Sequence, residues 1–136
     1  MARTQTQRHD GNRKRDYGLV AWIMAALLCL LPGYTLWRAA ARIPATYIVA
    51  YLIVISLVTL AVYWSDKRKA TRGAWRTPES TLHILEFAGG WPAAFLAQHL
   101  FRHKTAKTQY QLIFWAIAIL HQCLATAALY WRLPSP

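Results

Sequence analysis

Three long stretches without charged residues constrain the fold of this chain more than any other feature. They cover residues 17–37, 43–65 and 108–131. A helix of about 20 apolar residues, rising about 1.5 Å per residue, crosses the hydrocarbon core of a bilayer. Every backbone N–H and C=O in that core must be satisfied within the protein, so each stretch is expected to be helical. We therefore predict an all-α integral membrane protein with transmembrane helices at 17–37, 44–64 and 110–131.

The overall composition points to the same class of protein. Hydrophobic residues make up 56% of the chain and charged residues 15%, which argues against a soluble globular domain and against disorder. The first stretch is longer than the apolar core of a cleaved signal peptide, which has about 7–15 residues. It is therefore interpreted as a permanent span. The two cysteines lie inside apolar stretches and predict no disulfide framework.

The distribution of Lys and Arg predicts the orientation in the membrane. Residues 1–16 contain five of these cations, 38–43 two, 65–109 eight and 132–136 one. Because cations concentrate on the cytoplasmic side of a membrane, the N-terminal tail and residues 65–109 are expected to be cytoplasmic. The short loop 38–43 and the C-terminal tail are then periplasmic. The predicted location is the bacterial inner (cytoplasmic) membrane.

Between the second and third spans, a basic loop (65–77) is expected to lead into a helical hairpin (78–103). Thr77 is the predicted N-cap of the first arm, with Pro78 at the first helical position. Gly89 and Gly90 end this arm, and at least one of them is expected to need a positive φ. Pro92 then starts the second arm, and a linker (104–109) leads to the third span.

The sequence does not decide how deeply this hairpin enters the membrane. Its longest uncharged part, 87–101, is too short to cross a bilayer. A re-entrant hairpin would dip into the membrane with its turn shielded by the spans, because non-helical backbone at that depth must be buried in protein. An interfacial hairpin would lie flat on the membrane surface. Either form leaves both charged ends of the hairpin on the cytoplasmic side.

The segment that follows the second span resembles a known bacterial membrane family. The resemblance is carried by Asp66-Lys67, Ala70, Arg76, Pro78-Glu79, Leu82, Gly89-Gly90-Trp91-Pro92, Ala97 and Arg102-His103-Lys104-Thr105. This string is similar to the family catalogued as domain of unknown function 1294, from about residue 66 to the end of the third span. The resemblance implies a membrane protein without an established activity. Many members carry an N-terminal cold-shock domain, but residues 1–16 lack the aromatic strand motifs of that nucleic-acid-binding barrel.

Acidic and histidine side chains of the hairpin are the candidates for chemistry. Glu79, His83 and Glu86 share one helix face, and an antiparallel hairpin would set His83 near His99 and Glu79 near His103. Such groups can act as general acids and bases (Glu79, His83, Glu86) or bind a divalent metal (Glu79, His83, His99, His103). Ordinary salt bridges to Arg76, Arg102 or Lys104 are the third interpretation. The sequence identifies no cofactor.

Cations beside the second span form the other candidate site, for anionic lipid or a phosphate group. They are Lys67, Arg68, Lys69, Arg72, Arg76, Arg102, His103 and Lys104. Juxtamembrane cations attract anionic lipid, although they also serve simply as topology signals. The first function hypothesis is a non-enzymatic protein whose basic surface binds anionic lipid, a partner protein or, least expected without a cold-shock domain, a nucleic acid. The second is a membrane-embedded enzyme or carrier acting on a phosphate-bearing lipid.

Four further side chains have predicted roles. Asp66 is expected to pair with Lys69 or another nearby cation. His121, deep in the third span, is expected to form a hydrogen bond across the bundle rather than to relay protons. Trp75 and Trp91 are expected to anchor the chain at the membrane interface.

Overall fold

A computed structural model describes residues 22–40, 43–75 and 77–132, and these residues form α-helices joined by turns. The helices are Trp22–Ala39, α2 (Ala45–Thr71), α3 (Glu79–Leu85), α4 (Trp91–Phe101) and α5 (Thr108–Arg132). Three of them, Trp22–Ala39, α2 and α5, are long and apolar enough to cross a membrane. The predicted all-α architecture, with three helices of membrane-spanning length and composition, is therefore confirmed for the described residues. Arg76, the predicted tail 1–16, the start of the first span at Tyr17 and nearly all of the tail 132–136 lie outside the described residues.

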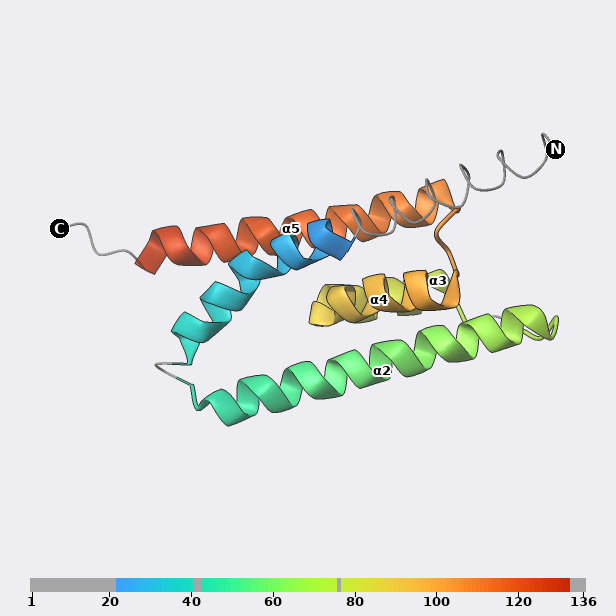
Figure 1. Ribbon diagram of the computed structural model, residues 1–136, viewed down its shortest axis with the longest axis horizontal. Helices are drawn as coiled ribbons and strands as arrows, with labels where there is room; N and C mark the ends of the chain where they lie inside the picture. The colour runs from blue at the N-terminus through green and yellow to red at the C-terminus, as the bar shows by residue number, and fades with distance from the viewer. Residues whose placement is uncertain (1–21, 41–42, 76, 133–136) are drawn as a thin grey trace, which may run out of the picture.

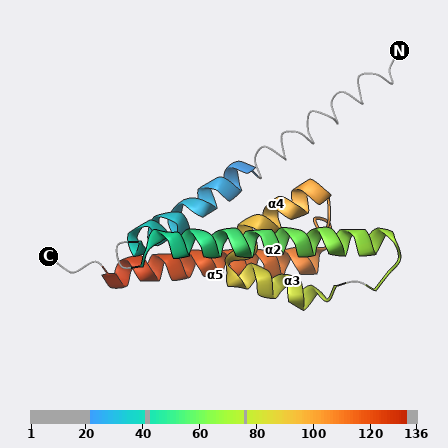
Figure 2. The ribbon, with the colours of Figure 1, turned by 90° about the horizontal axis from the view of Figure 1, so that it is seen from below.

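The two shortest helices lie between the long ones. In Figure 1, α2 and α5 run lengthwise on opposite sides of the molecule, with α3 and α4 between them at one end. The Trp22–Ala39 helix fills part of the space at the other end. Figure 2, turned by 90°, shows α3 and α4 diverging on either side of α2. The pair therefore forms a V whose closed end points toward the middle of the bundle.

A wide turn, Glu86–Gly90, forms the closed end of the V. Gly89 has φ 98° and ψ 1°, a conformation that favours glycine, and it breaks the helix at this point. α4 begins directly afterwards, with Pro92 in its first turn. The predicted break at Gly89 and the predicted restart at Pro92 are both confirmed. The Tyr51 hydroxyl of α2 donates a hydrogen bond of 2.5 Å to the Ala88 carbonyl, which satisfies a backbone group beside the break.

The core lies where the V meets α2 and α5. Its buried members include Tyr63, Leu82, Phe95, Tyr110 and Phe114. Outside this core, large apolar side chains are exposed along the long helices; Leu57 is 60% exposed and Ile119 is 59% exposed. Continuous apolar exposure of this extent is a liability in water, whereas lipid tails accommodate it without cost.

Three local predictions are wrong. The helix α2 continues to Thr71, so most of the predicted loop 65–77 is helical. Thr77 and Pro78 are each one position off, because α3 begins at Glu79 with Pro78 as its N-cap and without a side-chain cap. The Thr77 backbone N–H donates to Asp66 Oδ1 at 3.0 Å. Trp91 is no interface anchor: it is 3% exposed, because it starts α4 inside the bundle. Trp75, by contrast, is 91% exposed.

Candidate functional site

The Glu86 carboxylate is the centre of a buried hydrogen-bond network. Glu86 begins the wide turn and is fully buried. Its Oε1 accepts hydrogen bonds from the Tyr63 hydroxyl of α2 and, at 2.7 Å, from the Tyr110 hydroxyl of α5. Its Oε2 lies 2.7 Å from Nδ1 of His83 on α3. One carboxylate thus joins three helices to the turn, which is why it is tolerated inside an apolar bundle.

Amide side chains extend this network toward the end of the bundle that holds the charged residues. The two tyrosine hydroxyls lie 2.5 Å apart, and Gln98 Nε2 donates to the Tyr63 hydroxyl at 3.4 Å. Gln111 Nε2 donates to Gln98 Oε1 at 2.6 Å. Within the part of the chain that the structure describes, no buried side-chain nitrogen or oxygen lacks a hydrogen-bond partner. The network is complete, and such complete networks fix the relative positions of the elements they join.

His83 stands at the edge of the network. Its ring stacks on that of Tyr110, with 4.4 Å between the ring centroids, and 14% of its side chain is exposed. With the Glu86 carboxylate as acceptor, we assign the proton to Nδ1, so that Nε2 carries the lone pair. Among the described residues, Nε2 has no hydrogen-bond partner. The arrangement can therefore accept a proton at Nε2 while the carboxylate stabilises the charged ring.

A second carboxylate, Asp66, ties the charged ends of the V to α2. Asp66 is fully buried; its Oδ2 lies 2.8 Å from His103 Nε2 and 3.7 Å from Lys104 Nζ. Of the two predicted alternatives, Lys69 is not the partner, and Asp66 pairs instead with another cation, Lys104, which follows α4. Together with the bond from the Thr77 N–H, these contacts hold both ends of the segment between α2 and α5 against one residue.

Glu79 at the start of α3 is held by two lysines. Lys104 Nζ lies 2.7 Å from Glu79 Oε1, and Lys107 Nζ lies 2.8 Å from both Glu79 oxygens. The hydrogen bonds from Lys104 and then Lys107 lower the pKa of Glu79 from its ordinary value of 4.5 to about 2. The predicted salt bridge between Glu79 and Lys104 is confirmed. Lys104 bridges the two acids Asp66 and Glu79.

The structure does not bring the predicted metal-binding set together. Glu79, His83 and His103 each contact a different partner, as described above, and His99 Nδ1 faces the Phe95 carbonyl oxygen of its own helix at 2.9 Å. The arms of the V diverge around Tyr63 and Tyr110, so His83 and His99 do not meet. No cluster of three or more His, Cys, Asp or Glu side chains in the described part of the chain is placed to hold a metal ion. His121 also bonds within its own helix, to the Ile117 carbonyl, so the bond predicted across the bundle is wrong.

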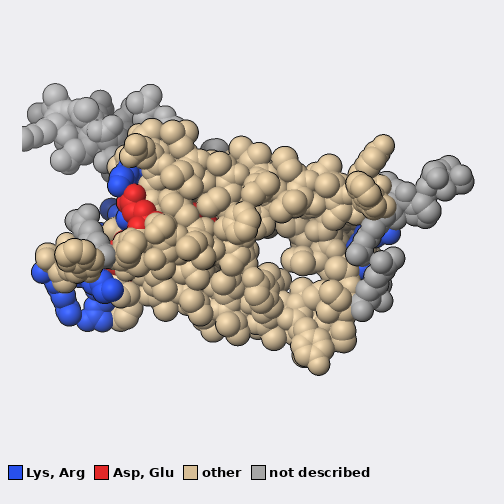
Figure 3. All heavy atoms as spheres, turned by 180° about the vertical axis from the view of Figure 1, so that it is seen from behind, with Lys and Arg blue, Asp and Glu red and all other residues tan. Residues whose placement is uncertain are grey.

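The predicted basic set divides into two groups. His103 and Lys104 are engaged by the carboxylates, whereas Arg68, Lys69, Arg72 and Arg102 are exposed and Lys67 is half-buried. We call these five the basic collar: Lys67, Arg68, Lys69, Arg72 and Arg102. Figure 3 shows the larger group of Lys and Arg side chains at one end of the molecule, next to the acidic groups, and a smaller group at the opposite end.

Sequence reasoning missed the partners of Glu86. A signal for one of them was present, because the buried residues of α2 are Thr59, Tyr63 and Asp66, spaced i, i+4 and i+7. These three polar side chains form one stripe along the helix. A buried polar stripe on a span marks the side that faces the protein.

Comparisons with known proteins identify relatives without an established activity. The sequence profile of the family described as "Protein of unknown function (DUF1294)" matches residues 56–110. This range contains the three carboxylates Asp66, Glu79 and Glu86. The chain is also 36% identical over 64 residues to "Uncharacterized protein YsdA" of Bacillus subtilis (strain 168). That alignment covers 47% of this chain and 72% of the relative. No solved structure was found to match the chain.

Proposed function

This chain belongs to the DUF1294 family of proteins of unknown function, and we propose from its own geometry that it is an inner-membrane protein that binds anionic lipid headgroups at its cytoplasmic face. In this proposal the basic collar is the binding surface. The V of α3 and α4 is a re-entrant hairpin that enters the bilayer from the cytoplasmic side. The N-terminus is cytoplasmic and the C-terminus periplasmic.

The observation that carries the proposal is the position of the collar relative to the membrane span. Its first three members, Lys67, Arg68 and Lys69, lie on α2 within five residues after Trp64, and Arg72 is the C-cap of the helix. The Arg68 guanidinium lies 4.5 Å from the centroid of the Trp64 ring, and this ring is 49% exposed. A tryptophan at the end of an apolar helix settles at the headgroups. Cations stacked on it and following it are then at the depth of lipid phosphates, which favours lipid over a nucleic acid or a protein as the partner.

The contacts of the wide turn support the re-entrant placement. Gly90 packs against Thr59, and Ala88 is bonded to Tyr51. Residue 54 is the midpoint of the apolar stretch 44–64, so these contacts fall within about five residues, or about 8 Å, of mid-depth on either side. A hairpin lying flat on the membrane surface would contact α2 near Trp64 instead.

Labelling of single cysteines tests this placement. In a chain with Cys29 and Cys123 replaced by Ala, we expect Trp75→Cys and Thr105→Cys to react with a membrane-impermeant maleimide from the cytoplasmic side only. Phe87→Cys, at the turn, should react from neither side although the side chain is 60% exposed in the protein. Labelling of residue 87 from the cytoplasm would mean a flat hairpin, and labelling of residue 105 from the periplasm would mean a crossing one.

Native mass spectrometry tests the binding surface. Wild-type protein in mild detergent should retain more phosphatidylglycerol than phosphatidylcholine, and the difference should shrink with salt. Replacing Lys67, Arg68, Lys69 and Arg72 by Gln should remove most of the salt-sensitive part of this difference, since each cation near the surface contributes about 1 kcal/mol. The matched control exchanges Lys for Arg and Arg for Lys at the same four positions, which keeps the charge. Unchanged salt-sensitive retention after neutralisation would leave these four cations as topology signals.

A second candidate function, acid–base chemistry at the hairpin, is favoured by the pairing of His83 with Glu86. An imidazole oriented by a carboxylate and partly open to solvent is the arrangement of a general base. The nearby Lys104, 5.1 Å from the Tyr110 ring centroid, adds positive charge that suits a phosphate-bearing substrate.

Complementation separates the two candidates. If the pair is catalytic, the His83→Gln variant should not restore the wild-type phenotype in a strain that lacks the gene. The level of the variant protein, measured by immunoblot, should nevertheless be normal. If the collar is the functional surface, His83→Gln should restore the phenotype and the collar variant should fail.

A further inference from the structure

The half of the bundle beyond the closed end of the V contains a large apolar cavity. Its volume is about 680 Å³, within the range of small-molecule binding sites. The cavity is bounded by the turn at Gly89, by the Trp22–Ala39 helix, by the start of α2 and by the second half of α5. The space-filling view in Figure 3 shows an opening through the molecule in this region. Its position follows from the fold, because the V holds α2 and α5 apart along their whole length but fills only one end.

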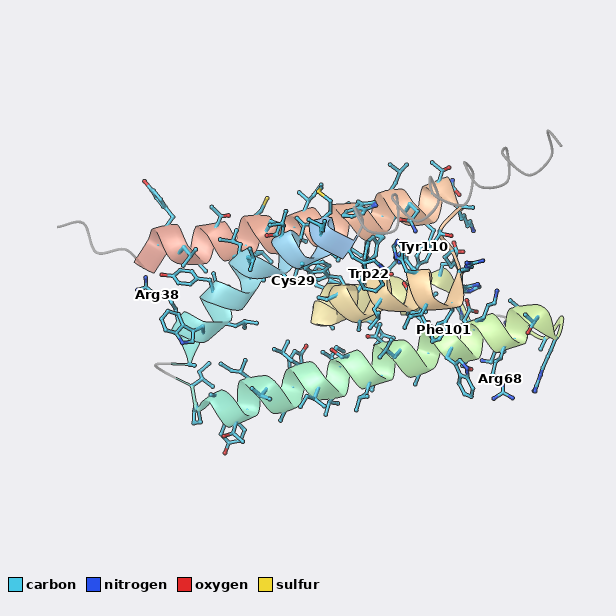
Figure 4. All side chains as sticks on the ribbon, viewed as in Figure 1. Trp22, Cys29, Arg38, Arg68, Phe101 and Tyr110 are labelled. Carbon is cyan, nitrogen blue, oxygen red and sulfur yellow. The ribbon has the colours of Figure 1, made fainter. Side chains whose placement is uncertain are left out.

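The cavity continues toward a cation. A smaller neighbouring cavity of about 230 Å³ shares three lining residues with it, Thr35, Leu36 and Ala128, and is also lined by Arg38. Figure 4 shows Cys29 on the Trp22–Ala39 helix near the middle of the bundle and Arg38 at its far end. The two cavities thus form one track, apolar at mid-depth and ending at a guanidinium.

We infer that this track binds one anionic phospholipid, with an acyl chain in the apolar cavity and the phosphate group at Arg38. The walls are mostly apolar and offer few hydrogen-bond partners to a polar ligand. An uncharged acyl chain, by contrast, loses no hydrogen bonds when it enters the cavity. If a space of this size were empty, the side chains that line it would lack van der Waals contacts on that side. In a bilayer, lipid acyl chains are available to fill it. Arg38 supplies the charge that selects an anionic headgroup. The assignment of this lipid to the periplasmic leaflet rests on the proposed orientation; the binding itself does not.

Native mass spectrometry with two neighbouring alanines of α5 tests the cavity. Ala128 lines both cavities, whereas its neighbour Ala127 lines neither. We expect Ala128→Trp to lose the phosphatidylglycerol molecule that wild type retains at high salt, and Ala127→Trp to keep it. Arg38→Gln should reduce the preference for phosphatidylglycerol over phosphatidylcholine about fivefold, the ratio expected for one cation near an anionic lipid. The fourfold collar variant should keep this lipid, which separates the inference from the proposed function.

The two native cysteines give a second measurement that needs no variant. Cys29 lines the large cavity, whereas Cys123 is exposed and does not. Added phosphatidylglycerol should slow the reaction of Cys29 with a small apolar maleimide and leave Cys123 unchanged. Equal lipid retention by Ala128→Trp and Ala127→Trp, or equal labelling of Cys29 with and without lipid, would overturn the inference. A lipid-free dimer that Ala128→Trp converts to a monomer would also overturn it, by assigning the cavity to a second copy of the chain.

Discussion

Gly90 lies so close to Thr59 that a Cβ added to the glycine would come within 2.3 Å of the Thr59 hydroxyl oxygen and 2.7 Å of the Leu85 carbonyl oxygen. The backbone of the wide turn and the middle of α2 are therefore in direct contact. Leu85 belongs to the helix that precedes the turn, so the neighbouring backbone leaves no room either. This contact sets how deeply the V can sit between α2 and α5.

Gly90→Ala is expected to destabilise the protein, because the added methyl group must displace a backbone carbonyl or α2. Overpacking of this kind costs about 1–3 kcal/mol. Thermal unfolding in detergent, followed by tryptophan fluorescence, should show a lower midpoint than wild type. Gly33→Ala is the control, since a Cβ there meets nothing within 4 Å. Equal midpoints for the two variants would contradict the close contact.

Tyr51→Phe should also lower stability, because it removes the donor to the Ala88 carbonyl beside the helix break. A polar group left unpaired away from water costs about 1–3 kcal/mol. Tyr47→Phe, one turn earlier on α2, is the matched change at a side chain that is 70% exposed. The same unfolding measurement applies, and the prediction fails if the two variants unfold at the same temperature.

Glu86→Leu is expected to be the most damaging single change in the network. It leaves His83 without its acceptor and the hydroxyls of Tyr63 and Tyr110 with only each other and Gln98. Glu86→Gln keeps the size and one acceptor oxygen, so its loss of stability should be smaller. Unfolding midpoints and yields of monodisperse protein compare the two variants. A leucine variant as stable as the glutamine variant would show that the network contributes little.

The ion pairs of Glu79 predict a loss of stability in acid. Folding lowers the pKa of Glu79 to about 2 from its ordinary value of 4.5, so the folded state favours the ionised form. The contribution is complete above about pH 4.5 and is lost as the pH falls toward 2. It should be modest and reduced by salt, because the Glu79 side chain is 35% exposed.

The measurement for Glu79 is the unfolding midpoint in detergent from about pH 5 to about pH 3. Wild type should lose more stability over this window than Glu79→Gln, which has no carboxylate to protonate. Parallel curves for the two proteins would show that the lysines do not stabilise the ionised form of Glu79.

Local patterns in the sequence were sufficient to predict the three helices of membrane-spanning length and the place where the hairpin breaks. Span length is set by the thickness of a bilayer, so an uncharged stretch such as 108–131 predicts a helix without reference to the rest of the chain. Gly89 and Pro92 act through their own backbone conformations, so the break and restart were also readable. The end of α2 could not be predicted in this way, because the charged residues after Trp64 contain no signal that stops a helix before Gly73.

Only the tertiary structure decided which side chains meet. Glu86 is 23 residues from Tyr63 and 24 from Tyr110, and Asp66 is 37 from His103. Helical spacing places residues on a face, but it does not say which helix lies opposite that face. The expectation that His83 would meet His99 assumed two arms packed on each other. The arms diverge because Tyr63 and Tyr110 reach between them to the same carboxylate, and that geometry depends on how α2 and α5 are placed around the hairpin.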